Sequence, residues 1–191
     1  MQHSFEYYPE RDEDACAIEA LLDRAFGHDR HNKTSYRFRD GIAPLRDLAL
    51  TGWLDGRLVG TVRFWPVVID RRWPALLLGP LAVDPEMRGR GCGIHLMRQS
   101  LANARARGHE RVILVGDLPY YSRVGFRQVP EGTLTLPGPF DPARLLMLEL
   151  VPGAMAGIRG PVGRADSRDS AAFAVPGGAE EPQQYCEGKQ R

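Results

Sequence analysis

The most informative stretch of this chain reads Leu81-Ala82-Val83-Asp84-Pro85-Glu86-Met87-Arg88-Gly89-Arg90-Gly91-Cys92-Gly93-Ile94. An apolar, strand-like run ends at Asp84-Pro85, three glycines follow at alternate positions, and an amphipathic segment begins at once. This order puts free backbone N–H groups at the start of a helix, where a phosphate binds well. Glycine loses the most conformational entropy when it is ordered, so three glycines at the start of a helix are costly in a mere connection. A backbone that must approach a ligand closely explains them better. The stretch therefore predicts a site for a phosphorylated cofactor, to which Arg88 and Arg90 add positive charge.

Two common phosphate-binding loops do not fit this stretch. The P-loop ends in Gly-Lys-Ser or Gly-Lys-Thr, and neither occurs here. The dinucleotide-binding fingerprint is G-x-G-x-x-G after a first strand. Here Gly89, Gly91 and Gly93 alternate, the third glycine comes one residue early, and the loop lies deep in the chain. The spacing therefore argues against a P-loop NTPase and against a nucleotide-binding oxidoreductase.

The hydrophobic pattern along the chain predicts a fold of class α/β (α+β). Apolar residues at i, i+3 and i+4 predict helices, Asp55-Gly56 predicts a hairpin turn, and short apolar runs predict strands. The expected strands are residues 3–8, 48–54, 57–65, 75–83, 111–115, 126–129 and 145–151, and the expected helices are 18–26, 94–108 and 119–124. Strands come first and a helix–strand–helix unit follows, which indicates one mixed central sheet with helices on both faces.

Composition further limits the number of domains, the partners and the compartment that we expect. The 191 residues suffice for one domain, and a net charge of +1 implies no general attraction to nucleic acid or to a membrane. The three cysteines are far apart, which suits a reducing compartment and a cytoplasmic protein, and nothing implies a metal. Glycine and proline interrupt the chain from Pro152 onward. We therefore expect a domain at residues 1–155 and a poorly ordered tail at 156–191.

Two motifs in this order resemble the GNAT superfamily of acyl-CoA N-acyltransferases. Arg88-x-x-Gly91-x-Gly93, which follows a Leu-Ala-Val strand end, resembles the pyrophosphate loop of that superfamily. Tyr120-Tyr121-Ser122-Arg123-Val124-Gly125-Phe126 looks like its Tyr-x-x-x-Gly-Phe signature. Together with Val115-Gly116-Asp117-Leu118-Pro119, this second motif is similar to a bacterial subgroup of predicted N-acetyltransferases with a Pro-x-Tyr-Tyr-x-Arg-x-Gly-Phe signature, although Pro119 here directly precedes the tyrosine pair. The resemblance covers roughly residues 3–152.

The resemblance implies a sheet that is splayed at its fourth strand, with the pantetheine arm of acetyl-CoA in the gap. Pro80 removes a hydrogen-bond donor from that strand, which indicates an edge strand or a bulge, and the resemblance favours the bulge. Asp117 stands where many relatives carry an asparagine that touches the cofactor; ionised, it accepts but cannot donate, and capping the next helix is its other expected role. The implied cofactor-binding residues are Leu81, Ala82, Val83, Arg88, Gly89, Arg90, Gly91, Cys92, Gly93, Ile94, Asp117, Tyr120 and Arg123.

Tyr121 aligns with the general acid of the superfamily. A thiol has a pKa of about 8.5 and a phenol of about 10, so a neutral phenol is available to protonate a departing thiolate. The transfer is uphill by roughly 1.5 pK units, so the site need lower the phenol pKa only modestly. The ordinary alternative is a core tyrosine with a satisfied hydroxyl. Adjacent helical residues point about 100° apart, so only one of Tyr120 and Tyr121 can face the sulfur, and the motif spacing selects Tyr121.

The predicted function is transfer of an acetyl group from acetyl-CoA to a primary amine, by direct attack in a ternary complex. The alternative is a non-catalytic acyl-CoA-binding sensor or interaction module, which would keep the glycine loop and lose the acid. Residues 26–46 and 130–142 would select the acceptor, which is a small molecule or a peptide amine. The sequence is also compatible with a homodimer. Ordered water serves as the base in many such enzymes, so no base is assigned among His28, Asp29, His31 and Asp40.

Overall fold

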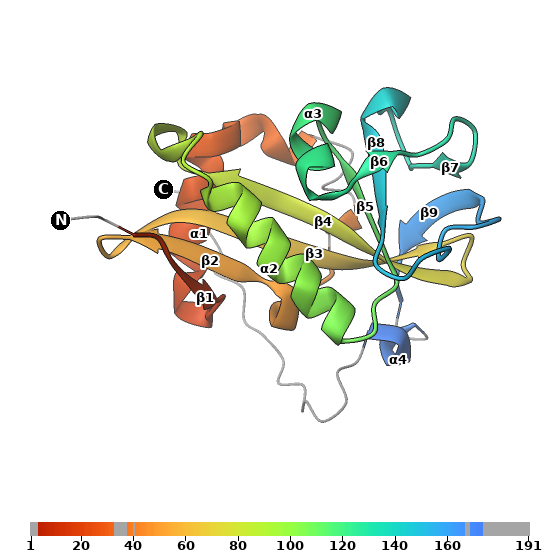
Figure 1. The fold of residues 1–191 in the computed structure, drawn as a ribbon, viewed down its shortest axis with the longest axis horizontal. Helices are drawn as coiled ribbons and strands as arrows, with labels where there is room; N and C mark the ends of the chain where they lie inside the picture. Colours follow the sequence, from red (N-terminus) through yellow and green to blue (C-terminus); the bar gives the residue numbers. More distant parts are fainter. Residues whose placement is uncertain (1–3, 33–37, 40, 167–168, 174–191) are drawn as a thin grey trace.

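A mixed sheet forms the centre of the fold (Figure 1). The computed structural model describes residues 4–32, 38–39, 41–166 and 169–173. Its strands are β1 (Glu6–Pro9), β2 (Leu50–Leu54), β3 (Arg57–Ile69), β4 (Trp73–Val83), β5 (Arg111–Val115), β6 (Arg127–Gln128), β7 (Leu134–Thr135), β8 (Leu145–Glu149) and β9 (Gly160–Arg164). The main path through the sheet is β1-β2-β3-β4-β5-β8-β6, in which only β4 and β5 are parallel neighbours. The predicted mixed sheet is confirmed.

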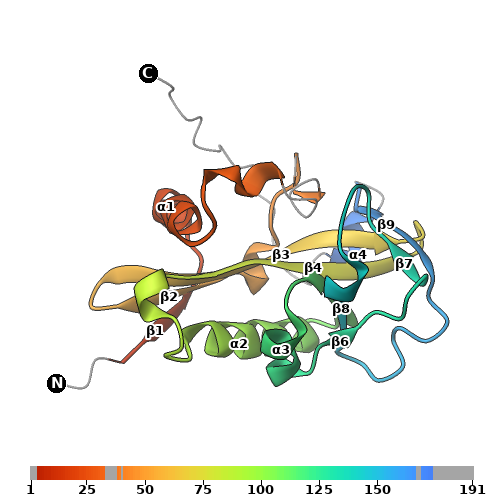
Figure 2. The ribbon, with the colours of Figure 1, turned by 90° about the horizontal axis from the view of Figure 1, so that it is seen from above.

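Helices cover both faces of this sheet, as Figure 2 shows. They are α1 (Ala15–Phe26), α2 (Cys92–Ala106), the short α3 (Leu118–Tyr121) and the short α4 (Ser170–Phe173). On one face of the sheet, Ile18, Leu21 and Leu22 of α1 pack with Leu58 and Ala82. α2 and α3 lie on the opposite face, where the apolar side of α2 packs into the largest core cluster. None of the helices in the described ranges combines the length and the apolar composition that crossing a bilayer requires.

A bulge interrupts β4 at Gly79-Pro80, as the position of the proline indicates. Val62 pairs with Leu81 and Phe64 pairs with Leu78, so β4 holds one residue more than β3 between these two pairs. Proline has no N–H to donate to the ladder, and a bulge is a position at which the ladder is already broken. The bulge is therefore confirmed. β4 as a whole is not an edge strand, because it lies between β3 and β5, but Pro80 stands in the half of β4 that does not pair with β5.

The second half of β4 diverges from β5. Within the described part of the chain, β4 pairs with β5 through Leu76 and Leu77 alone, opposite Val112 and Ile113. The remaining residues of β4, 78–83, keep β3 as a neighbour on one side but do not pair with β5 on the other. Backbone groups at this end of the strand are thus available to something other than the sheet.

The packed chain extends beyond the expected boundary at residue 155. β9 pairs with β3, which places Val162 opposite Ile69, and Val162 is 2% exposed. Phe173 of α4 is buried too, and its ring lies 6.3 Å from that of His109. The expectation that residues 156–166 belong to a poorly ordered tail is therefore wrong, because a short strand with one inward valine gives too little periodicity to read from sequence. Residues 174–191 lie outside the described residues, and their order stays a prediction.

Candidate active site

The glycine loop opens α2 with left-handed backbone conformations. The φ angles of Gly89 and Gly91 are +78° and +91°, values that other residues adopt only under strain. A Cβ at either position would meet no heavy atom within 4 Å, so both face open space. Within α2, His95 donates its N–H to Gly91, and the N–H groups of the first turn before it point out of the helix end. The loop therefore offers several N–H donors to an anion.

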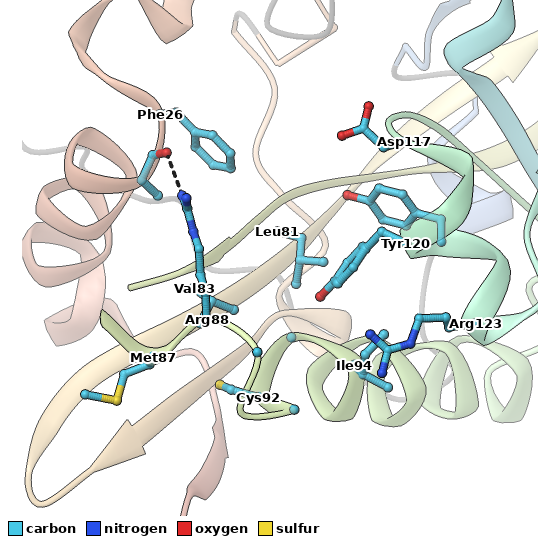
Figure 3. Close-up of a pocket in the computed structure, with 15 residues that line it drawn as sticks. Phe26, Leu81, Val83, Met87, Arg88, Cys92, Ile94, Asp117, Tyr120 and Arg123 are labelled. Atoms are coloured by element: carbon cyan, nitrogen blue, oxygen red, sulfur yellow. Dashed lines mark hydrogen bonds between the residues drawn. The ribbon is translucent and has the colours of Figure 1, made fainter. Parts of the chain in front are cut away.

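A cleft of about 370 Å³ lies beside this loop, between the end of β4, the start of α2 and α3 (Figure 3). We call it the loop cleft. The predicted residues that line it are Leu81, Val83, Arg88, Gly89, Gly91, Cys92, Gly93, Ile94, Asp117, Tyr120, Tyr121 and Arg123. The structure thus brings together in one cleft the two motifs that the sequence carries far apart, and it supplies the arginines and backbone donors that a diphosphate fits.

Two predicted cofactor-binding residues do not line the loop cleft. Ala82 is 1% exposed and packs with α1 on the other face of the sheet, because neighbouring residues of a strand point to opposite faces. The guanidinium of Arg90 lies 6.0 Å from the ring of Phe5, and its Nη1 donates to the sulfur of Met87. Neither side chain reaches the cleft in this structure, so a contact of Ala82 or Arg90 with the cofactor would have to come from the backbone, and it stays a prediction.

Three further residues line the loop cleft, although none of them was predicted to bind the cofactor: Ala25, Phe26 and Met87. Ala25 and Phe26 end α1, and the side chain of Phe26 is 38% exposed in spite of its apolar ring. Nη2 of Arg88 donates to the carbonyl oxygen of Ala25 at 3.3 Å, which joins the glycine loop to the end of α1 (Figure 3). Phe26 follows the apolar spacing of α1, so sequence pattern alone places it in the core.

Cys92 meets the cleft chiefly through its backbone. Its side chain is 1% exposed and points toward β2 and β3, where a Cβ on Gly60 would lie 2.7 Å from its sulfur. Burial raises the pKa of the Cys92 thiol to about 11, so the thiol stays protonated at neutral pH. A buried neutral thiol is unreactive, and Cys92 therefore serves as a small core residue at the start of α2.

A second cleft, of about 420 Å³, lies beside the bulge, and we call it the bulge cleft. Its walls come from the end of α1, the bulge, the end of β5 and the loop before β8. Its lining residues are Phe26, Arg30, Arg39, Leu77, Leu78, Gly79, Pro80, Leu81, Val115, Gly116, Asp117, Tyr121, Pro139, Phe140, Asp141 and Arg144. Phe26, Leu81, Asp117 and Tyr121 line both clefts, so the clefts meet at these four residues.

Two glycines make room for the tyrosine pair. A Cβ on Gly93 would collide with the hydroxyl of Tyr120, and a Cβ on Gly116 would collide with the ring of Tyr121. The two rings stand nearly perpendicular, with centroids 5.2 Å apart. Tyr120 lines the loop cleft only, whereas Tyr121 lines both clefts. Tyr121 is therefore the tyrosine that can touch ligands in both.

The electrostatic surroundings of Tyr121 differ from the expectation. Burial raises the pKa of Tyr121 well above its ordinary value, and the nearby Tyr120 and Asp117 raise it further. The guanidinium groups of Arg144 and Arg39 act on the pKa in the opposite direction but do not reverse the shift. The expectation of a modestly lowered phenol pKa is therefore wrong for this structure. Tyr121 holds its proton throughout the physiological range, and giving it up costs more than for an exposed phenol.

Asp117 does not cap the helix that follows it. It stands at the N-cap position of α3, but its side chain makes no capping hydrogen bond. Instead its carboxylate lies 3.2 Å from the guanidinium of Arg144, and both side chains are at least half exposed. Such an exposed pair contributes little to stability. Asp117 and Arg144 together form a charged rim on the bulge cleft.

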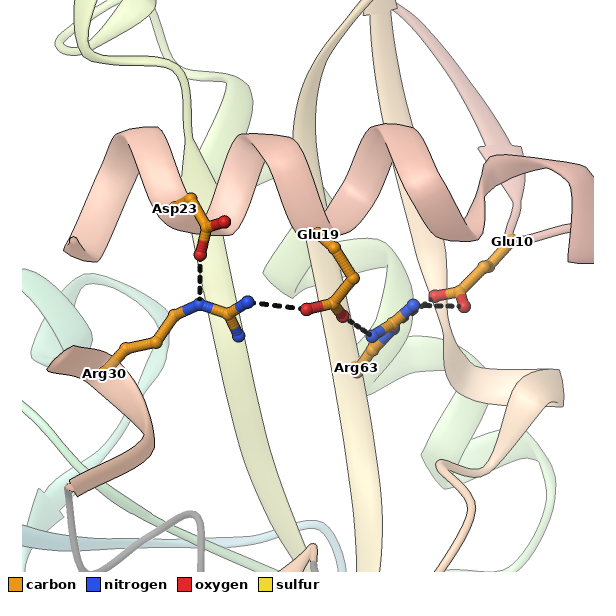
Figure 4. A network of polar contacts seen from close by, with 5 residues as sticks. All are labelled: Glu10, Glu19, Asp23, Arg30 and Arg63. Carbon is orange, nitrogen blue, oxygen red and sulfur yellow. Dashed lines mark hydrogen bonds and ion pairs between the residues drawn. The ribbon is translucent and has the colours of Figure 1, made fainter. Parts of the chain in front are cut away.

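A chain of ion pairs fixes the wall of the bulge cleft on the side of α1 (Figure 4). Arg63 of β3 donates to both carboxylate oxygens of Glu10 at 2.8 Å, and its Nη1 lies 3.3 Å from Glu19 of α1. Glu19 in turn accepts from Arg30 at 2.6 Å, and Arg30 also donates to Asp23 at 2.9 Å. The side chain of Arg30, which lines the cleft, is 4% exposed. Burying such charges costs desolvation free energy, which offsets much of their attraction. The network therefore fixes the position of Arg30 in the cleft wall more than it stabilises the fold.

Among the residues that the structure describes, no candidate base lines either cleft. His28 is 89% exposed and lies 3.4 Å from Asp23. Asp29 is exposed as well, while Asp40 and the side chain of His31 lie outside the described residues. Across the described ranges, no group of three His, Cys, Asp or Glu side chains is placed to hold a metal ion.

A splayed mixed sheet, a glycine loop that opens α2 and a tyrosine where two clefts meet define an acyltransferase class of fold. The chain belongs to the GNAT acetyltransferase family: the model of the acetyltransferase (GNAT) domain matches residues 6–129. It is 32% identical over 151 residues to YhbS of Escherichia coli K12, described as an uncharacterised N-acetyltransferase, and the match covers 77% of this chain and 88% of YhbS.

Solved structures agree with this assignment. The crystal structure of YhbS from Escherichia coli in complex with CoA superposes with a TM-score of 0.71 at 28% identity, covering 91% of this chain and 94% of that one. A GNAT family acetyltransferase from Brucella melitensis in complex with acetyl-CoA gives a TM-score of 0.64 at 26% identity, covering 88% of this chain and all of that one. The predicted family and fold are confirmed.

Proposed function

We propose that this protein transfers an acetyl group from acetyl-CoA to a primary amine by direct attack, with acetyl-CoA in the loop cleft and the amine in the bulge cleft. The single observation that carries this proposal is that the two clefts meet at Tyr121. One side chain can then act on the donor and the acceptor at once. The complexes of the two related structures with CoA and acetyl-CoA support the choice of donor.

The loop cleft has the parts that an acyl-CoA requires. The N–H groups of residues 91–94 and the side chain of Arg88 would hold the diphosphate. The unpaired side of β4 at Leu81 and Val83 would hold the pantetheine amides through backbone hydrogen bonds. Acetyl-CoA supplies the reactive thioester, and the chain positions its carbonyl carbon beside the bulge cleft.

Tyr121 would complete the reaction as the general acid. The amine nitrogen forms a bond to the acetyl carbon, the bond between that carbon and sulfur breaks, and the amine loses a proton to water. Tyr121 gives its proton to the departing sulfur and regains one from solvent. Its raised pKa keeps the proton in place until then, while Arg39 and Arg144 favour the phenolate that forms briefly.

An acceptor panel tests this proposal. Purified protein is incubated with acetyl-CoA and with single amines (amino acids, peptides, polyamines and aminoglycosides), and free thiol release is recorded against a blank without amine. The proposal predicts release that depends on one class of amine and acetylation of that amine by mass spectrometry. CoA binding without transfer to any amine would contradict the catalytic role and would favour an acyl-CoA-binding module.

A further inference from the structure

A buried carboxylate stands directly between β4 and the glycine loop. Asp84 is 2% exposed, and its Oδ1 accepts from the backbone N–H of Glu86 at 3.1 Å. Its Oδ2 accepts from Nη2 of Arg57 at 2.6 Å and lies 3.4 Å from Nε of Arg24. Burial by itself raises the pKa of Asp84, but the hydrogen bonds from Arg57 and Glu86 hold it below its ordinary value. The carboxylate is therefore ionised and held on several sides.

The partners of Asp84 come from elements that are distant in the sequence. Arg57 begins β3, and Arg24 lies in the last turn of α1. The backbone of Asp84 adds two further bonds, since its N–H donates to Val59 and its carbonyl accepts from Met87, both at 2.8 Å. One residue thus fixes the entrance of the glycine loop against β3 and α1 at the same time.

The loop is joined to α1 at a second point. Arg88 donates to the carbonyl oxygen of Ala25, the residue after Arg24. Ala25 and Phe26 then line the loop cleft, and Phe26 lines the bulge cleft as well. The last turn of α1 is therefore held over both clefts by contacts that originate at Asp84 and at Arg88.

We propose that Asp84 is a positioning residue for acyl-CoA: through Arg57 and Arg24 it sets the glycine loop and the end of α1 in the arrangement that receives the diphosphate. Asp84 lines neither cleft, so it acts through these partners. The inference rests on the proposed function, since it assumes that acyl-CoA occupies the loop cleft. A loop that is already in its binding arrangement loses less entropy when the ligand arrives, so weakening its attachments lowers affinity without removing a contact.

Asp84→Asn tests the inference, because it keeps the shape and removes the charge. Calorimetric titration should show CoA binding weakened by about tenfold. The affinity for ADP, which has the diphosphate without pantetheine, should fall by the same factor. The affinity for pantetheine, which lacks the diphosphate, should stay within twofold, whereas a general loss of structure would lower all three affinities. Asp55→Asn, the same change at an exposed acid two residues before Arg57, is the control and should stay within twofold of the original protein.

Arg57→Gln and Arg24→Gln keep the test decisive if Asp84→Asn does not fold. Each removes one charged partner of Asp84 and should weaken CoA binding by about threefold, and the two together by about tenfold. A folded Asp84→Asn protein, or a folded double arginine variant, that binds CoA within twofold of the original protein would overturn the inference alone. An original protein that binds no CoA would overturn the proposed function, and this inference with it.

Discussion

The loop cleft and the bulge cleft are neighbours of similar size, but they are built in different ways. Most residues of the loop cleft come from one continuous stretch, residues 81–94. We propose that they bind a ligand largely through backbone groups. The bulge cleft draws on separate segments from Phe26 to Arg144 and presents side chains: aromatic rings, leucines and five charged residues. A backbone cradle suits a donor of fixed chemistry, whereas a wall of side chains from many segments can be altered one residue at a time.

The largest expected effect lies where the two clefts meet. Tyr121→Phe removes the hydroxyl and keeps the ring, so CoA affinity should stay near its original value. The turnover number should fall by roughly 10²- to 10⁴-fold, which is the usual contribution of one acid–base group. Steady-state kinetics with the acceptor found in the panel and calorimetry with CoA measure the two quantities.

Tyr120→Phe is the matched control for this change and should lower turnover much less, because Tyr120 lines the loop cleft only. Loss confined to Tyr120→Phe would exchange the roles of the two tyrosines. The pH profile adds a second check. A phenol loses its proton above its pKa, and that of Tyr121 is raised, so turnover should not decline between pH 7 and about 9.5. A decline there that disappears in Tyr121→Phe would mean that the phenol pKa is not raised.

The next largest effect should fall on the loop cleft alone. Gly91→Glu adds bulk and negative charge at the start of α2, where the φ of +91° already disfavours a side chain. We expect CoA affinity to drop by at least roughly 100-fold, as judged by calorimetry. Gly108→Glu makes the same change at another left-handed glycine, φ +83°, just beyond the opposite end of α2. If both variants fold and bind CoA equally well, the loop does not hold the diphosphate.

A smaller effect should separate the bulge cleft from the loop cleft. Glu19→Gln removes the charge that lies between Arg30 and Arg63, so the buried wall residue Arg30 loses one of its fixed partners. The KM for the acceptor should rise by roughly three- to tenfold while CoA affinity stays unchanged. Glu13→Gln, a change at an exposed acid beside the same helix, is the control. Equal losses for acceptor and CoA would mean that the network supports the whole domain rather than one cleft.

The smallest effect is expected at Asp117, which both clefts share. Asp117→Asn removes a negative charge that raises the pKa of Tyr121, so proton donation becomes slightly easier. Turnover should rise by about two- to threefold at most, because the side chain is 76% exposed and water screens its charge. A tenfold or greater loss of turnover would instead identify Asp117 as a catalytic group.

The same contrast explains how much the sequence could predict. Glycine spacing, the hairpin turn at Asp55-Gly56 and the position of Pro80 are local signals, and each predicts a feature that the structure contains. Phe26 falls within residues 26–46, which were expected to select the acceptor, but its place in the loop cleft could not be predicted, since its helical spacing looks the same whether the end of α1 is covered or open. The raised pKa of Tyr121 was equally hidden, because it depends on burial and on charges brought close only by folding.

The most direct measurement is a crystal structure of this protein with CoA bound. The diphosphate should accept hydrogen bonds from backbone N–H groups of residues 91–94. The sulfur should lie within hydrogen-bond reach of the Tyr121 hydroxyl, at the junction of the loop cleft and the bulge cleft. A diphosphate bound away from the glycine loop, or a sulfur that contacts Tyr120 and not Tyr121, would contradict the proposed binding of acetyl-CoA and the role of Tyr121.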